Sequence, residues 1–229
     1  MKIGIIGAMA VEVESLKAKV ESKTVETVSG IEFVSGILCG KEVVIAQCGI
    51  GKVFAAICTE AMIVRYGVDA VINTGVAGTL SENIGILDLA ISDAVVQHDM
   101  DTSPLGDPVG LLSGINIVKL PAADWLVDKI SAAADKMGIR HERGVIASGD
   151  QFISNADKKK YIKGEFGAIA CEMEGGSVGH VCYVNGVDFA VIRSISDNAS
   201  GEANMEYPEM VKRAAAQSEA LVIKTLSSL

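Results

Sequence analysis

Residues 168–182, AIACEMEGGSVGHVC, decide how the fold of this chain is interpreted. The stretch begins as an apolar run typical of a buried strand, and it then places Glu172 and Glu174 on either side of a methionine. A carboxylate in a low-dielectric interior is costly unless it is paired, hydrogen-bonded or protonated. The two glutamates are therefore either ordinary residues at the rim of a sheet or the contacts of a ligand that carries hydroxyl groups.

Similar apolar runs recur along the chain and alternate with segments of helical spacing. Residues 25–38 add a hairpin pattern that turns at Ser29 and Gly30, and residues 97–119 show little periodicity and are expected to form a long loop. The alternation predicts an α/β fold whose largely parallel or mixed sheet is covered by helices on both faces. The expected strands are residues 2–8, 42–48, 69–73, 88–96, 144–147, 168–172 and 188–194, and helical spacing occurs at residues 13–20, 53–64, 125–133 and 211–223.

Length and composition indicate one compact unit. The chain has 229 residues, of which 49% are hydrophobic, and no linker-like stretch interrupts it. We therefore expect a single domain over residues 1–229. The net charge of −9 disfavours binding to nucleic acid or to an anionic membrane. The run of Lys158, Lys159 and Lys160 stands alone and is interpreted as a solvated helix face.

The sequence also predicts a compartment. No apolar run reaches the roughly 18 residues that a membrane helix needs. The opening MKIGIIGAMAVEVE lacks the long apolar core and the cleavage site of a signal peptide. The five cysteines are scattered without a CxxC pair, which is typical of buried small side chains in a reducing compartment. We expect a cytoplasmic protein.

The sequence matches three familiar site motifs only in part. GIIGAMA departs from the dinucleotide pattern GxGxxG, and GIGKV lacks both the first glycine of a P-loop, at Ala46, and a hydroxyl residue after Lys52. The acids and histidine of HDMD (98–101) alternate between the two faces of a strand, so spacing alone does not bring them together around a metal ion. No GxSxG pattern supports acyl transfer.

Polar or glycine-rich segments follow most of the expected strands, where ligands of open α/β sheets bind. A single acid at such a place is typical of a helix N-terminus. Asp197 stands out because it follows the apolar run AVIRSIS (190–196), at a place where the chain leaves the core. Arg193, inside that strand, needs an anionic or polar partner, which one of these acids could supply. The segments are Met9 with Glu12, CGIGK (48–52), NTGVAGT (73–79), SGDQFI (148–153), CEMEGG (171–176) and RSISDNA (193–199).

Six motifs together resemble, in order and spacing, the 5′-methylthioadenosine/S-adenosylhomocysteine nucleosidase family of the nucleoside phosphorylase-like superfamily. They are IGIIGAMAVEVE (3–14), GIGKV (49–53), NTGVAG (73–78), SGDQFI (148–153), EMEGGSVGHV (172–181) and IRSISD (192–197). The resemblance implies a single-domain α/β fold with a central mixed, barrel-like sheet, a homodimer, and neither cofactor nor metal. It also implies irreversible hydrolysis of an N-glycosidic bond, giving adenine and a 5-substituted ribose, in methionine salvage and in recycling of S-adenosylmethionine by-products.

The same resemblance implies roles for individual residues. Glu12 matches the base that activates the attacking water, and Asp197 matches the acid that protonates the adenine N7. Glu174 matches the residue that holds the ribose hydroxyls, and Arg193 matches the arginine beside the water. The other matches are Phe152 and Ile153 at the adenine, Met173 at the ribose, Met9, Ile50 and Tyr207 in the apolar lining, and Val76, Ala77, Gly78, Glu172 and Ser196 beside them.

The chain departs from the family pattern at three positions. Val76 stands where many members carry a small hydroxyl residue, Thr79 where a second glycine is common, and Tyr207 where phenylalanine is common. One hydrogen bond near the site is therefore expected to be missing, and the 5′ end of the pocket is expected to be more polar.

These residue types suit the cleavage of a nucleoside. Breaking the bond leaves positive charge on the sugar and negative charge on the purine, so an acid beside the purine and carboxylates beside the sugar favour the reaction. Two carboxylates with room for water between them form the inverting arrangement, in which the carboxyl groups stand roughly 6.5–9.5 Å apart. On this interpretation Glu174 faces the ligand, and Glu172 is the bystander.

Three alternatives use the same residues differently. A purine nucleoside phosphorylase needs an anion site, usually built from arginines, whereas the arginines here start at Arg65 and Glu12 repels phosphate. A nucleosidase for aminodeoxyfutalosine would use the same catalytic residues. A non-catalytic purine sensor could lose Glu12 or Asp197, and the chain keeps both. In a homodimer, residues 101–114, with Leu105, Val109, Leu111 and Leu112 exposed, are expected to close the 5′ end of a neighbour's pocket.

Overall fold

The computed structural model describes residues 1–197 and 207–229, with Tyr207 described by its backbone alone. The strands are β1 (Lys2–Gly7), β2 (Glu21–Val28), β3 (Ile31–Leu38), β4 (Lys41–Gln47), β5 (Ala70–Thr79), β6 (Leu89–Gln97), β7 (Leu120–Pro121), β8 (His141–Ser148), β9 (Ala168–Glu172) and β10 (Asp188–Asp197). The helices are α1 (Ala10–Lys19), α2 (Lys52–Tyr66), the 3-10 turn η1 (Ser103–Leu105), α3 (Asp124–Met137), α4 (Ala156–Phe166), α5 (Gly175–Asn185) and α6 (Tyr207–Leu226).

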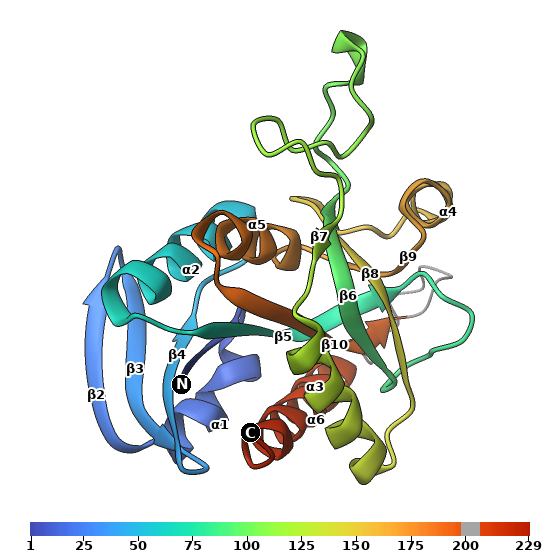
Figure 1. Ribbon diagram of the computed structural model, residues 1–229. Helices are drawn as coiled ribbons and strands as arrows, with labels where there is room; N and C mark the ends of the chain where they lie inside the picture. Colours follow the sequence, from blue (N-terminus) through green and yellow to red (C-terminus); the bar gives the residue numbers. More distant parts are fainter. Residues whose placement is uncertain (198–206) are drawn as a thin grey trace.

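A mixed sheet that partly closes on itself forms the centre of the molecule (Figure 1). The strands follow the order β10-β6-β8-β9-β5-β1-β4-β3-β2, and β10 also pairs with β5. This second pairing closes β5, β10, β6, β8 and β9 into a five-stranded barrel, and the remaining strands extend the sheet from β5. The predicted mixed, barrel-like α/β fold is confirmed, as is the hairpin that turns between β2 and β3.

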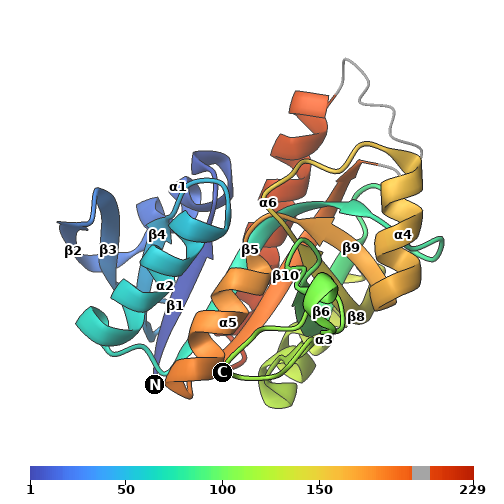
Figure 2. The same ribbon diagram turned by 90° about the horizontal axis from the view of Figure 1, so that it is seen from above.

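Helices cover both sides of the sheet, as the sequence predicts. Helices α2 and α5 pack against each other on one side, and α6 packs against both α1 and α3 on the other (Figures 1 and 2). The three isoleucines of β1, Ile3, Ile5 and Ile6, are fully buried. Within the described residues, no helix combines the length and apolar character that a membrane crossing requires.

Three strands are longer than the sequence predicts, and one of them is β8, which is expected at residues 144–147. Residues 73–79 are expected to follow a strand but belong to β5, and residues 195–197 belong to β10. Both extensions arise from closure of the barrel, because Arg193 to Asp197 of β10 pair with Gly75 to Gly78 of β5. The polar side chains in these segments therefore lie on paired strands, which local sequence does not reveal.

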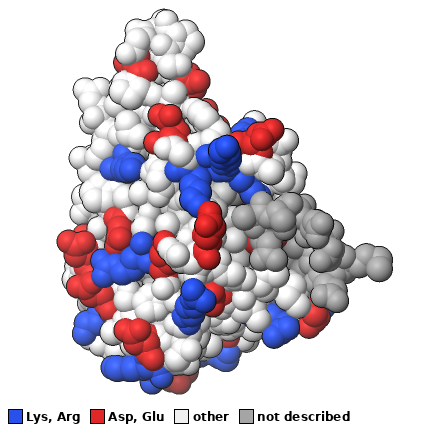
Figure 3. Space-filling view, turned by 90° about the vertical axis from the view of Figure 1, so that its right-hand side faces the viewer, with Lys and Arg blue, Asp and Glu red and all other residues white. Residues whose placement is uncertain are grey.

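Two features of the surface differ from expectation. Lys159 is buried, so the interpretation of Lys158, Lys159 and Lys160 as one solvated face is wrong for its middle residue. Cys39 is exposed, whereas the other four cysteines are buried as expected. On the face at the right of Figure 1, acidic and basic side chains are interspersed (Figure 3).

The connection between β6 and β7 is the long loop that the sequence predicts, and it projects from the body of the molecule (Figure 1). It contains η1 and a bridge between Leu112 and Ile117. Leu105 is 83% exposed, Val109 and Leu111 are half-buried, and Leu112 is only 3% exposed. The expected exposure is therefore confirmed for Leu105 and wrong for Leu112.

Candidate active site

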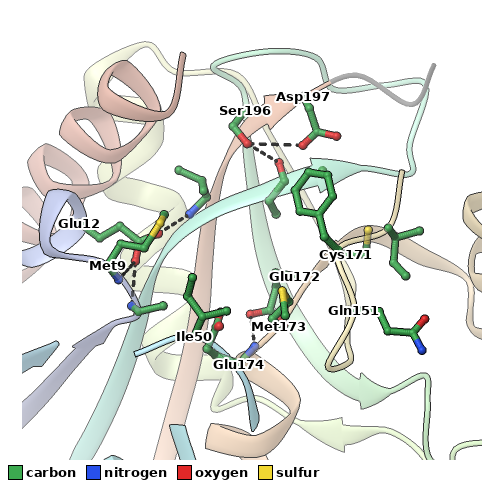
Figure 4. A pocket seen from close by; sticks show the side chains of 16 residues that line it. Met9, Glu12, Ile50, Gln151, Cys171, Glu172, Met173, Glu174, Ser196 and Asp197 are labelled. Atoms are coloured by element: carbon green, nitrogen blue, oxygen red, sulfur yellow. Dashed lines mark hydrogen bonds between the residues drawn. The ribbon is translucent and has the colours of Figure 1, made fainter. Parts of the chain in front are cut away.

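A pocket lies where β1, β5, β9 and β10 end and where the loops after β4 and β8 approach them (Figure 4). These segments are distant in sequence and meet because the barrel places the strand ends at one rim. The pocket is lined by Ala8, Met9, Glu12, Ile50, Val76, Ala77, Gly78, Gln151, Phe152, Ile153, Cys171, Glu172, Met173, Glu174, Ser196 and Asp197.

Glu12 lies in the first turn of α1 and is only 3% exposed. One carboxylate oxygen accepts hydrogen bonds from the backbone N–H groups of Ala8 and Met9, at 2.8 and 2.9 Å, and the other accepts one from Val76 at 3.2 Å. Burial raises the pKa of Glu12, and the nearby Arg193 charge and the backbone hydrogen bonds oppose that effect. Glu12 is thus a helix N-terminal acid that also lines the pocket, where it can act as a base.

Arg193 lies behind the pocket, only 1% exposed, and forms a close ion pair with Glu172. Its guanidinium also donates to the Asn73 side-chain oxygen at 2.6 Å. Glu172 in turn accepts hydrogen bonds from the N–H groups of Gly175 at 2.8 Å and Glu174 at 3.0 Å. Burial alone would raise the pKa of Glu172, but Arg193 and these hydrogen bonds hold it below the ordinary value. Glu172 therefore stays ionised and anchors the arginine.

Glu174 has a different environment from Glu172, two residues earlier. One of its oxygens accepts a hydrogen bond from the Gly51 N–H at 2.9 Å, and the other lies 3.7 Å from the Arg193 guanidinium. Burial and the neighbouring Glu172 charge raise the pKa of Glu174 to about 7. A carboxyl group that gains and loses its proton near neutral pH can donate or accept a hydrogen bond with a ligand hydroxyl.

Asp197 ends β10 on a different side of the pocket from Glu12 (Figure 4). Its carboxylate lies against the backbone of Gly78, where an added Cβ would come within 3.0 Å of one oxygen. Ser196 contacts Oδ1 at 3.4 Å, and the buried Lys159 lies 3.3 Å from Oδ2. Glycine at position 78 therefore leaves the room that this carboxylate occupies.

Comparison with known proteins identifies the family. The phosphorylase superfamily model matches residues 2–227. Over the full length of both chains, the sequence is 40% identical to the 5′-methylthioadenosine/S-adenosylhomocysteine nucleosidase of Shewanella putrefaciens and 39% identical to that of Shewanella pealeana. The chain belongs to the 5′-methylthioadenosine/S-adenosylhomocysteine nucleosidase family.

Solved structures of nucleosidases share this fold. The Neisseria meningitidis nucleosidase in complex with methylthio-immucillin-A gives a TM-score of 0.95 at 32% identity, covering 100% of this chain and 99% of that one. An aspartate-to-asparagine mutant of the Helicobacter pylori nucleosidase, with 5′-methylthioadenosine in its active site, gives 0.94 at 35% identity with the same coverage. A futalosine hydrolase of Helicobacter pylori gives 0.94 at 36% identity, covering 100% of this chain and 98% of that one.

The structure brings together nearly all residues that the nucleosidase resemblance implies. Arg193 is the exception among the described side chains, because it is paired with Glu172 and is not part of the pocket lining. The side chain of Tyr207 falls outside the described residues. Sequence reasoning missed three lining residues, Ala8, Gln151 and Cys171, each of which is adjacent in sequence to a residue that it identified. Within the described residues, no cluster of three or more metal-binding side chains was found.

Glu174→Gln is expected to change how stability depends on pH. Because the pKa of Glu174 is raised from 4.5 to about 7, the folded protein holds a proton that the unfolded chain has released between those values, so wild-type stability falls as pH rises through this window. The variant lacks this titration. Its stability relative to wild type should therefore rise between about pH 5 and pH 8, by on the order of 2 kcal/mol.

Thermal or denaturant unfolding at the two pH values measures this difference. Glu165→Gln, which changes an exposed glutamate on α4, is the matched control and should follow the wild type. If Glu174→Gln also followed the wild type at both pH values, the raised pKa of Glu174 would be refuted.

Proposed function

We propose that this chain hydrolyses the N-glycosidic bond of 5′-methylthioadenosine and S-adenosylhomocysteine, and also of 5′-deoxyadenosine. The products are adenine and the 5-substituted ribose. The observation that carries the proposal is the placement of Glu12 and Asp197 on different sides of one pocket, with Glu174 also in its lining (Figure 4). Family membership supports the same reaction.

In the proposed reaction Asp197 gives a proton to N7 of the purine while the bond from the sugar C1′ to N9 breaks. The bonding electron pair leaves with the purine, which departs as neutral adenine, and positive charge develops on the sugar. Glu12 removes a proton from a water molecule, whose oxygen forms the new bond to C1′. Burial raises the pKa of Glu12, which makes it a stronger base than an exposed glutamate.

The remaining residues bind the nucleoside. Glu174 accepts hydrogen bonds from the ribose hydroxyls, and these bonds strengthen as the sugar becomes positive. Arg193 acts from behind by keeping Glu172 ionised and paired. Phe152, which is 58% exposed at the rim, stacks on the adenine, and the backbone of Ile153 meets the edge of the base. Met9, Ile50 and Met173 supply the apolar lining for the ribose and its 5′ substituent.

The wider setting is also part of the proposal. Residues 1–229 act as one nucleosidase domain, because strands from the first to the last third of the chain share one sheet. The reaction serves methionine salvage and the recycling of S-adenosylmethionine by-products in the cytoplasm. Four of the five cysteines are buried with none paired, in keeping with a reducing compartment.

A second substrate is supported by one comparison. The futalosine hydrolase of Helicobacter pylori shares the fold at 36% identity, so aminodeoxyfutalosine is the alternative nucleoside. A phosphorolytic reaction is less well supported, because the described pocket lining contains no arginine or lysine and Arg193 is held by Glu172. Phosphate would have to approach beside Glu12 without a cationic partner.

Release of free adenine tests the reaction and the substrate together. The purified protein should release adenine from 5′-methylthioadenosine, S-adenosylhomocysteine and 5′-deoxyadenosine in phosphate-free buffer. Added phosphate should leave the rate unchanged and should form no ribose 1-phosphate product. Phosphate-dependent release would contradict hydrolysis, and cleavage of aminodeoxyfutalosine alone would replace the proposed substrates by the alternative one.

Removal of either carboxylate should abolish most turnover. Asp197→Asn cannot donate the proton and Glu12→Gln cannot accept one, so each variant is expected to fold but to lower kcat by at least about 10²-fold. Glu14→Gln, in the same helix as Glu12 but with an exposed side chain, is the control and should keep the wild-type rate. Wild-type turnover in a folded variant would remove that residue from the chemistry.

We also propose a homodimer whose interface includes the outer faces of α2 and α5. These two helices pack together and carry apolar side chains that are 40% or more exposed, which is typical of a surface that a partner covers. The projecting connection between β6 and β7, with Leu105 at its tip, extends to the 5′ end of the partner's pocket. The exposed apolar residues of the two helices are Val53, Phe54, Ile57, Val64, Tyr183 and Val184.

Light scattering of paired variants tests the interface. Ile57 and Ile86 are both 40% exposed, but only Ile57 lies on α2. Ile57→Glu should weaken the dimer and Ile86→Glu should leave it intact, because a buried unpaired carboxylate is costly only within the interface. A monomeric wild type would contradict the dimer, and a dimeric Ile57→Glu would move the interface elsewhere.

A further inference from the structure

Lys159 is a buried cation beside the proposed general acid. Its side chain is only 4% exposed, and its ammonium group lies 3.3 Å from Oδ2 of Asp197, which is itself 12% exposed. The lysine lies on the buried face of α4 together with Ile162 and Phe166, whereas the adjacent Lys160 points to solvent. The position on the helix therefore turns this one lysine of the run toward the pocket.

Nothing in the local structure of α4 favours a lysine at this place. Lys159 lies in the first turn of the helix, where its backbone N–H donates a hydrogen bond to the Asn155 carbonyl at 3.0 Å. The N-terminal turn carries the positive end of the helix dipole, which disfavours a cation, and burial of an ammonium group disfavours it further. A carboxylate partner offsets both costs, and Asp197 provides one from the end of β10.

The two carboxylate oxygens of Asp197 have different partners. Lys159 holds Oδ2, whereas Oδ1 has the longer 3.4 Å contact with Ser196. On the other side, the backbone at Gly78 leaves little space, since a Cβ there would lie 3.0 and 3.1 Å from the two oxygens. The carboxylate is thus confined between β5 and α4.

We propose that Lys159 is a positioning residue that holds Asp197 for proton transfer to the purine and stabilises the carboxylate that the transfer leaves behind. This inference rests on the proposed function. When the O–H bond of Asp197 breaks and the N7–H bond forms, negative charge appears on Asp197 next to the ammonium group of Lys159. Lys159 itself transfers no proton in this step. An interaction that strengthens as the reaction proceeds lowers the barrier rather than merely binding the substrate.

Few other titratable groups of residues 1–197 and 207–229 face this pair. Strand β9 contributes Cys171 and Glu172. Strand β5 contributes no charge, because its residue beside Asp197 is Gly78. Cys171 lies in the fields of both partners, and burial raises the pKa of its thiol to about 12, so it stays neutral at working pH. Glu172 is already paired with Arg193. Lys159 is therefore the described cation that acts on Asp197 directly.

The test compares variants in adenine release from 5′-methylthioadenosine. Lys159→Met removes the charge and the hydrogen bond, so kcat should fall by about tenfold while KM changes by less than about threefold. The loss is expected in kcat because the interaction strengthens only as negative charge develops on Asp197, whereas a merely structural role would not separate kcat from KM in this way. Lys159→Arg should restore the rate, and Lys160→Met is the matched control.

A folded Lys159→Met with the wild-type kcat would overturn the inference. If that variant does not fold, Lys159→Gln, which keeps a hydrogen-bond donor without charge, replaces it. The kcat of the Gln variant should lie below that of Lys159→Arg at a similar KM, and equal kcat values would overturn the inference. A wild type that releases no adenine would instead overturn the proposed function, so the two failures are distinguishable.

Discussion

The site depends on one buried cation, Arg193, which is only 1% exposed. A guanidinium in that position is tolerable only if carboxylates and hydrogen-bond acceptors surround it, because an unpaired buried charge is strongly destabilising. Glu172 supplies the close ion pair, Asn73 supplies a neutral acceptor, and Glu174 lies within 3.7 Å. Once Arg193 is committed to Glu172, Glu174 is left with a raised pKa and with capacity for a ligand. Two glutamates with one residue between them thus acquire different protonation and different roles.

The barrel makes this arrangement possible. Arg193 and Asp197 lie on β10, Glu172 lies on β9, and Glu12 follows β1, so three strands and a helix terminus must end at the same rim. The pairing of β10 with β5 closes the ring and sets the register of these two strands. Backbone N–H groups then donate hydrogen bonds to the carboxylates, as Ala8 does to Glu12 and Gly51 does to Glu174. The fold and the site are therefore one set of constraints, since the pairing that closes the barrel also positions the acids.

Much of the fold was predictable, because buried strands appear in a sequence as continuous apolar runs and polar residues gather where such strands end. Helix α5 was not predicted, since GGSVGHVCYVN is rich in glycine and buried on several sides and so shows no clear apolar face. The ends of β5 and β10 were underestimated because barrel closure, a long-range event, turns polar segments into paired strand. The burial of Lys159 was missed for a similar reason, because its partner Asp197 lies 38 residues away. The motifs identified most of the residues that line the pocket but not which of them are held by others.

The central claim is that opposed carboxylates enclose a single nucleoside in this pocket. The most direct measurement is a crystal structure with an adenosine analogue whose N-glycosidic bond cannot be hydrolysed. The account predicts the purine N7 within hydrogen-bond distance of Asp197, the ribose hydroxyls on Glu174, and a water molecule between Glu12 and C1′. A nucleoside bound elsewhere, or in this pocket with its purine directed away from Asp197, would contradict the account.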